Sequence, residues 1–249
     1  VLLLEAGGMD RHPLIHMPAG FAEMTTGPFT WGMTTTPQKY ANEREIPYIQ
    51  ARVIGGGSSI NAEVFTRGHP SDYDRWAGEG CSGWAFSEIQ QYFLRSEGNS
   101  ILSGDWHGTE GPLAVSNLAE PQLMTRAFVK ACQEYGIPYN PDFNGPKQEG
   151  TGTYQINTKN ARRWSAAVGY LRPAIKRPNL SIKTDCLAHR IIIEKGRATG
   201  VEYSKGGTRV IVSATSEVVV AAGAIGSPKL MLLSGIGPAV HLNEVGVKV

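Results

Sequence analysis

The chain has 249 residues, enough for one large domain or two small ones, and its 41% hydrophobic and 18% charged residues are typical of a globular protein. A formal net charge of +2 and the lack of a Lys/Arg-rich block argue against a nucleic-acid partner, and no apolar run approaches the ~20 residues of a transmembrane helix. The three cysteines are far apart, which argues against a disulfide framework and favours a reducing compartment, and no His/Cys cluster predicts a metal site.

The chain opens in an apolar run. Val1–Leu4 predicts a buried parallel strand, and Glu5–Gly8 predicts the turn that follows it. Further along, the glycine-rich turn 55–59 leads into residues 60–65, where we expect a helix to start. Because residues 246–249 also read as the start of a strand, we expect the chain to be cut from a longer protein at both ends.

Several later segments carry helix and strand signals. Helices are predicted from a capping box at Ser87 to about residue 98, over 121–135, over 165–171 before Pro173, and over 229–233 after Ser227–Pro228. Strands are predicted at Leu180–Ile182, Arg190–Ile193, Thr199–Tyr203, Arg209–Val212 and Glu217–Val220. The middle three strands suggest an antiparallel meander, and the last reads as a buried strand.

Three segments carry chemical signals. Glu5 ends an apolar strand, where an acidic residue can accept hydrogen bonds from an adenosine ribose; the alternative is a solvated surface carboxylate. The glycines and serines of 51–61 can bring backbone amides to a diphosphate, with Asn61 near a ribityl or pyrophosphate oxygen; the alternative is a flexible turn. The small residues of 222–238 permit close approach of a cofactor, or they form an ordinary strand–turn–helix.

Together these segments resemble the two signature segments of the glucose–methanol–choline (GMC) oxidoreductases, in their sequence, order and separation. The resemblance extends over essentially the whole chain and is greatest to the choline-dehydrogenase-like branch. It is carried by residues 51–65 and 223–237, Trp31 with Thr36–Gln38, Trp84 with Tyr92, Phe93 and Glu97, Gly150–Gly152, Arg163–Ala167, and Arg177–Leu180.

The resemblance implies an α/β fold with α+β character. In it, a Rossmann-like FAD-binding sheet is joined by an antiparallel β-meander and an inserted cap of helices and loops, and the fold is incomplete in this chain. The implied domains are an FAD-binding part at 1–70, a substrate-side insertion at 71–160, and a continued FAD-binding part at 161–249.

The resemblance also implies FAD as the cofactor. Some members attach FAD covalently through a His that precedes the Asn of the first signature, and Ile60 stands there instead, so non-covalent FAD is expected. Glu5 would hold the ribose, the glycine turn the pyrophosphate, and the residues after Asn61 the ribityl chain and flavin edge. The implied cofactor-binding residues are Glu5, Gly56, Gly57, Ser58, Asn61, Ala62, Val64, Ala188 and Ala222.

The implied activity is hydride transfer from an alcohol to flavin N5, with electrons passed on to a quinone, a carrier or oxygen. The family's catalytic His–His or His–Asn pair has no match before Val249, so no catalytic residue is assigned, and the six histidines are read as surface or structural. The chain by itself is expected to be inactive, in the cytoplasm or peripheral to the inner membrane. The alternatives are a hydroxynitrile lyase on the same scaffold and a non-catalytic fragment or pseudoenzyme.

Overall fold

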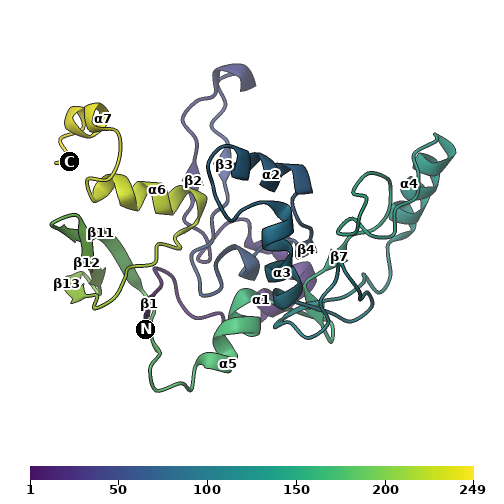
Figure 1. The fold of residues 1–249 in the computed structure, drawn as a ribbon, viewed down its shortest axis with the longest axis horizontal. Helices are drawn as coiled ribbons and strands as arrows, with labels where there is room; N and C mark the ends of the chain where they lie inside the picture. Colours follow the sequence, from purple (N-terminus) through teal and green to yellow (C-terminus); the bar gives the residue numbers. More distant parts are fainter. The chain divides into compact units, whose positions relative to one another are not determined.

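A computed structural model describes all of residues 1–249, which form two compact units (Figure 1). Unit 1 contains Val1–Asp10, Thr26–Gly56 and Ile175–Val249, and unit 2 contains Arg11–Thr25 and Gly57–Ala174. Each unit is thus assembled from segments that are distant in the sequence.

Unit 1 is built around short sheets and a three-stranded meander. Its elements are β1 (Leu2–Leu4), β2 (Met33–Thr34), the 3-10 helix η2 (Lys39–Ala41), β3 (Pro47–Tyr48), β10 (Ser181–Lys183), β11 (Cys186–Glu194), β12 (Arg197–Lys205), β13 (Thr208–Ser213), α6 (Gly223–Leu233) and α7 (Ala239–Glu244).

The strand predictions for unit 1 are largely confirmed. β1 pairs in parallel with β10, with Leu3 opposite Ile182, and β11, β12 and β13 form the antiparallel meander. The end of α6 is fastened to the meander because the backbone N–H of Ile191 donates to Ser234 Oγ at 2.8 Å. The alternation of apolar residues and the turns that contain glycine therefore predicted these strands correctly.

Unit 2 combines helices with very short strands. Its elements are α1 (Pro13–His16), the 3-10 helix η1 (Pro18–Met24), β4 (Val64–Phe65), α2 (Pro70–Gly78), α3 (Phe86–Ser96), β5 (Glu97–Asn99), β6 (Leu113–Val115), α4 (Leu123–Glu134), β7 (Gln155–Ile156), β8 (Thr158–Lys159), β9 (Arg162–Arg163), the π-helix η4 (Ala167–Leu171) and α5 (Arg172–Ala174). The 3-10 helix η3 (Gly56–Ser59) begins at the last residue of unit 1.

A network of buried charges lies in unit 2. Glu97 at the start of β5 is fully buried and pairs with the Arg67 guanidinium. His107 bridges two carboxylates, with Nδ1 2.9 Å from Glu97 Oε1 and Nε2 2.9 Å from Asp142 Oδ2. Asn99 donates to Glu97 Oε1 at 2.7 Å. Burial alone would lower the pKa of His107, but its hydrogen bonds to Glu97 and Asp142 outweigh that effect and raise the pKa.

Several predicted helix ends are wrong. The helix after residue 85 begins at Phe86 and not at Ser87, because the Glu88 carboxylate accepts from the backbone N–H of Ala85 at 3.1 Å. The short helix of 165–171 does not end before Pro173, because this proline lies in the first turn of α5, where no N–H is required.

Two further corrections concern the segments that lead to and from the glycine-rich turns. Residues 60–65 do not start a helix, because Glu63 adopts a left-handed conformation with φ +64° and the chain then enters β4. α6 begins at Gly223 and not after Ser227–Pro228, and it includes Pro228.

Two expected strands are also absent. Glu217–Val220 pairs with no strand of the chain, and Val219 is 77% exposed. An apolar run forms a buried parallel strand only where neighbouring strands accept its backbone hydrogen bonds. Residues 246–249 are likewise not a strand.

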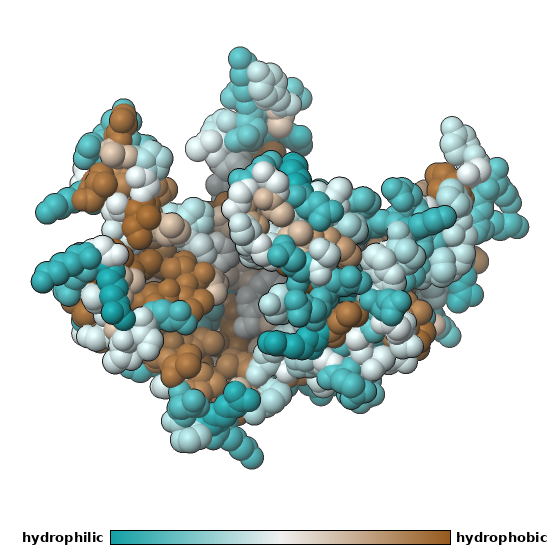
Figure 2. Space-filling model, viewed as in Figure 1, coloured by the Kyte–Doolittle hydropathy of each residue, from teal (hydrophilic) through white to brown (hydrophobic).

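The surface of unit 1 is partly apolar. Figure 2 shows hydrophobic side chains gathered in the part of the surface that contains α6 and the meander. Exposed apolar residues of these elements include Ile193, Ile211, Ile225 and Leu233. Contiguous apolar surface of this kind is typical of a site of contact with another protein segment. All the helices are too short or too polar to span a lipid bilayer.

The turn after β1 meets the segment before the glycine-rich turn at backbone distance. A methyl group on Gly7 would lie 1.9 Å from the Arg52 carbonyl oxygen, so only glycine fits there. Next to it, the Ile54 N–H donates to the Gly8 carbonyl at 3.0 Å. The turn at 5–8 and the segment 52–56 are therefore held side by side.

Gly7→Ala should lower the free energy of unfolding by roughly 1–3 kcal/mol, because backbone atoms must move to admit the methyl group. Urea denaturation measures the change. Gly8→Ala is the matched control, since a methyl group there would meet nothing within 4 Å. Equal midpoints for the two variants would contradict the close approach.

His107 should make stability depend on pH. Because its folded pKa is raised above the ordinary value of 6.5, its contribution is complete below that value and is lost as the pH rises through the folded pKa. Denaturation of wild type across this range should show the decline, and His107→Gln should flatten it. His241→Gln, at an exposed histidine, serves as the control and should keep the decline. A wild-type profile that rises with pH here would show that His107 is not charged in the folded state.

Candidate functional site

The Glu5 carboxylate lies at the end of β1 in unit 1. Its Oε1 accepts from the backbone N–H of Gly7 at 2.7 Å, and the backbone N–H of Ala6 also interacts with this carboxylate. Burial raises the pKa of Glu5, while the Gly7 hydrogen bond and the Arg52 charge oppose that shift. A half-buried carboxylate at a strand end is suited to accept further hydrogen bonds from a diol such as a ribose.

Ala188 lies in β11, and the first residue of this strand is hydrogen-bonded to the backbone of Glu5. The Glu5 N–H donates to the Lys183 carbonyl at 3.0 Å, and the Cys186 N–H donates to the Glu5 carbonyl at 2.9 Å. Ala188 is two residues further along β11, at an irregularity of the pairing with β12. The strand that carries Ala188 therefore starts beside Glu5.

The second glycine-rich segment also reaches this region of unit 1. Gly223, which opens α6 with φ +83°, would place a methyl group 3.4 Å from Gln50 Oε1. The neighbouring Ala222 is exposed, and its N–H donates to Ser227 Oγ at 3.0 Å. Ala222 thus lies near the segment that leads into the first glycine turn.

The remaining predicted residues belong to one turn. Gly56 has φ +55°, and methyl groups on Gly56 or Gly57 would meet nothing within 4 Å, so the space beside this backbone is open. An open glycine backbone at the start of a helical turn fits a diphosphate, whose oxygens need close approach to N–H groups. Ser58 accepts through Oγ from the Ala166 N–H at 2.9 Å.

Asn61, Ala62 and Val64 follow this turn in unit 2, and all three are exposed. Ile60, between the glycine turn and Asn61, is 8% exposed and offers no nucleophile. Exposed small and apolar side chains beside a polar amide are suited to contact the edge of a flat ring system and its polar chain.

Two buried residues that hold this turn were not identified from the sequence as site residues. The Arg163 guanidinium reaches the turn from β9, and Glu63, which follows the turn, lies 3.3 Å from it. Arg163 belongs to a segment that supported the family resemblance, but no sequence pattern predicts that its side chain lies against residues 58–63.

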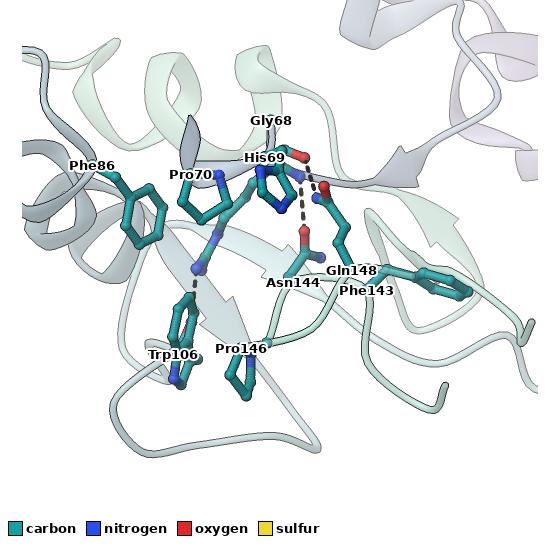
Figure 3. A pocket seen from close by; sticks show the side chains of 11 residues that line it. Gly68, His69, Pro70, Phe86, Trp106, Phe143, Asn144, Pro146 and Gln148 are labelled. Atoms are coloured by element: carbon teal, nitrogen blue, oxygen red, sulfur yellow. Dashed lines mark hydrogen bonds between the residues drawn. The ribbon is translucent and has the colours of Figure 1, made fainter. Parts of the chain in front are cut away.

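The hollows in the surface of unit 2 lie away from the predicted residues. One, shown in Figure 3, is bordered by the rings of Phe86 and Trp106 and by Arg67, whose carbonyl accepts from Gln148 Nε2 at 2.9 Å. Its volume of about 20 Å³ is enough for a water molecule and not for a substrate. A larger, shallow hollow is lined by Glu110, Lys159 and Trp164. Neither contains a predicted cofactor residue.

Comparison with known proteins gives a consistent family. A protein-family profile described as GMC oxidoreductase matches residues 12–248. Over the whole chain, the sequence is 45% identical to the oxygen-dependent choline dehydrogenases of Sinorhizobium fredii and Rhizobium meliloti, and the match covers 45% of each of them. The chain therefore spans about half the length of the curated relatives it matches.

Solved structures agree with this result. The chain superposes on pyridoxine 4-oxidase from Mesorbium loti with a TM-score of 0.94 at 31% identity, covering 100% of this chain and 49% of that one. For an FAD-dependent oxidoreductase from Chaetomium thermophilum the TM-score is 0.93 at 32% identity, with 100% and 45% covered. The expected family resemblance, the mixed helix-and-strand fold class and FAD as the cofactor are thereby confirmed, because the matched region is that family's FAD-binding domain.

Proposed function

Because the chain belongs to the GMC oxidoreductase family, we propose that it supplies the nucleotide-binding part of an enzyme that transfers a hydride from an alcohol to flavin N5. The observation that carries the proposal is the meeting, within unit 1, of Glu5, the segment before the glycine turn and the start of α6. These are the parts of a nucleotide site that supply a ribose acceptor and close backbone approach.

The proposed roles follow from the geometry of each residue. The Glu5 carboxylate would accept from the ribose hydroxyls, and the open backbone of Gly56, Gly57 and Ser58 would approach the pyrophosphate. Backbone groups at Ala188 would pair with the adenine. Asn61, Ala62 and Val64 would contact the ribityl chain and flavin edge, and Ala222 would pack against the nucleotide.

FAD, when bound, supplies the two-electron acceptor of the reaction. The residues of this chain would bind and orient it, and the buried Ile60 would leave it attached without a covalent bond. We assign no catalytic base to the residues of this chain, and we propose a substrate-side insertion at 71–160 between FAD-binding parts at 1–70 and 161–249.

The substrate class is proposed from the relatives. Their names include choline and pyridoxine as compounds acted on, and both carry an alcohol. We therefore propose a small alcohol as substrate, with a quinone, a carrier or oxygen as the electron acceptor.

The main test uses the protein expressed at its full encoded length. Purification should yield a yellow protein, and denaturation should release free FAD because no covalent bond holds it. Anaerobic addition of a small alcohol such as choline should bleach the flavin absorbance. A folded protein without flavin would overturn the FAD site. A flavin that no alcohol bleaches, together with cleavage of a cyanohydrin, would favour the hydroxynitrile lyase alternative; bound flavin with neither activity would favour a pseudoenzyme.

Glu5→Gln should weaken FAD binding by about tenfold, since a charged acceptor of the ribose hydroxyls is lost while the hydrogen bond to Gly7 is kept. Titration of the apoprotein with FAD measures the change. The control is Glu194→Gln, which alters an exposed glutamate of the same unit and should leave the affinity unchanged. Equal affinities for wild type and Glu5→Gln would remove Glu5 from the proposed site.

A further inference from the structure

The Glu63–Arg163 ion pair is buried in unit 2. Arg163 is 2% exposed and Glu63 is 3% exposed, and Arg163 Nη2 lies 3.3 Å from Glu63 Oε1. Glu63 Oε2 and Arg163 Nη2 have no hydrogen-bond partner. A buried ion pair with unmet hydrogen bonds adds little to stability, because desolvation of both charges offsets their attraction. The role of the Glu63–Arg163 pair is therefore to be found elsewhere than in the stability of the fold.

The other nitrogens of Arg163 hold the turn that carries the proposed flavin contacts. Nε donates to the carbonyl of Ile15 at 2.8 Å, which fixes the guanidinium against the end of α1. Nη1 donates to the Ser58 carbonyl at 3.1 Å and to Asn61 Oδ1 at 2.8 Å. One guanidinium thus contacts both ends of the segment 58–61.

These contacts decide which way the Asn61 amide faces. Its Oδ1 accepts from Arg163 Nη1 and also from the Glu63 N–H at 3.1 Å, which fills both acceptor positions of a carbonyl oxygen. A flipped amide would place its NH2 group against two donors. The NH2 group therefore points away from the pair, it has no partner within the protein, and the residue is exposed.

Glu63 maintains this arrangement at a conformational cost. Its φ of +64° lies in the left-handed region, which costs a non-glycine residue on the order of 1–3 kcal/mol. That conformation aims its N–H at Asn61 Oδ1 and its carboxylate at Arg163, while its carbonyl accepts from the Asn157 N–H at 2.8 Å. Burial raises the pKa of Glu63, and the Arg163 charge opposes that shift.

We propose that Arg163 and Glu63 are positioning residues that lock Asn61 with its NH2 group outward, as a hydrogen-bond donor to an acceptor atom of the bound flavin nucleotide. The inference rests on the proposed FAD site and makes it sharper. Asn61 can donate to a flavin, ribityl or phosphate acceptor, and it cannot accept from a ribityl hydroxyl.

Asn61→Asp tests the direction of this hydrogen bond. Aspartate keeps an oxygen toward Arg163 and the Glu63 N–H, and it replaces the outward donor by an acceptor. In the full-length protein, FAD affinity should fall by about tenfold or more, while the denaturation midpoint of the apoprotein stays at that of wild type. Asn61→Leu, which removes the inward contacts as well, should lower that midpoint. The control Asn160→Asp, at an exposed asparagine of the same unit, should change neither quantity.

Arg163→Lys tests the lock itself, because lysine cannot reach all three acceptors. The variant should weaken FAD binding several-fold, and Asn61→Asp should then cost less than about threefold in its background. Such non-additivity is expected of a positioning residue, whereas a purely structural role gives additive effects. If Arg163→Lys does not fold, Glu63→Gln, which keeps the side-chain volume, replaces it in the same double-mutant cycle.

The outcomes separate this inference from the proposed function. Wild type that binds no FAD overturns the FAD site and the role of Asn61 with it. Wild type that binds FAD, with Asn61→Asp binding within about twofold of it, overturns the lock alone. An apoprotein midpoint for Asn61→Asp as low as that for Asn61→Leu also overturns it, because the amide oxygen would then not face Arg163.

Discussion

The candidate site depends on the contact of two stretches of backbone in unit 1. Gly7 faces the Arg52 carbonyl with no room for a side chain between them. This contact places the Glu5 carboxylate beside the segment that enters the glycine turn, although α1, η1, β2, η2 and β3 lie between the two in the sequence. The Glu5 carboxylate can therefore take part in the proposed site only because Gly7, which has no side chain, lets the two backbone segments meet.

Arg163 has the corresponding role in unit 2. Its guanidinium is enclosed, and it contacts the carbonyl of Ile15, the carbonyl of Ser58 and the amide of Asn61. Within unit 1 the proposed cofactor residues are held by backbone proximity, and within unit 2 they are held by a buried charge. In each unit, the residue that would contact the ligand, Glu5 or Asn61, is held in place by a residue that would not contact it.

The sequence predicted what depends on local pattern. The meander of β11–β13 has alternating residues and glycine turns, and β1 is a short apolar run, so both were identified. The run 217–220 has the same apolar character and is not a strand, because pairing depends on partners that the local sequence does not reveal. Likewise, the signature motifs indicated Asn61 but not its orientation.

The residues missed are those whose roles depend on distant contacts. Arg163 and Ile15 are 148 positions apart, and nothing in the segment around Arg163 indicates that its charge is buried. The contact between Glu97 and His107 was likewise not predicted, because the two residues are ten positions apart and belong to no common motif. A charge within a segment of small and apolar residues, such as Glu63, was the one available signal, since a charge in such a setting is buried only with a partner.

The left-handed backbone at Glu63 has an evolutionary consequence. Glycine at this position would relieve the conformational strain, and it would also remove the counter-charge of Arg163. The strain that would be relieved, on the order of 1–3 kcal/mol, is smaller than the roughly 3–5 kcal/mol that an unpaired buried charge costs. The strained glutamate is therefore retained by its buried partner, and we expect an exchange at position 63 to be tolerated only together with an exchange of Arg163.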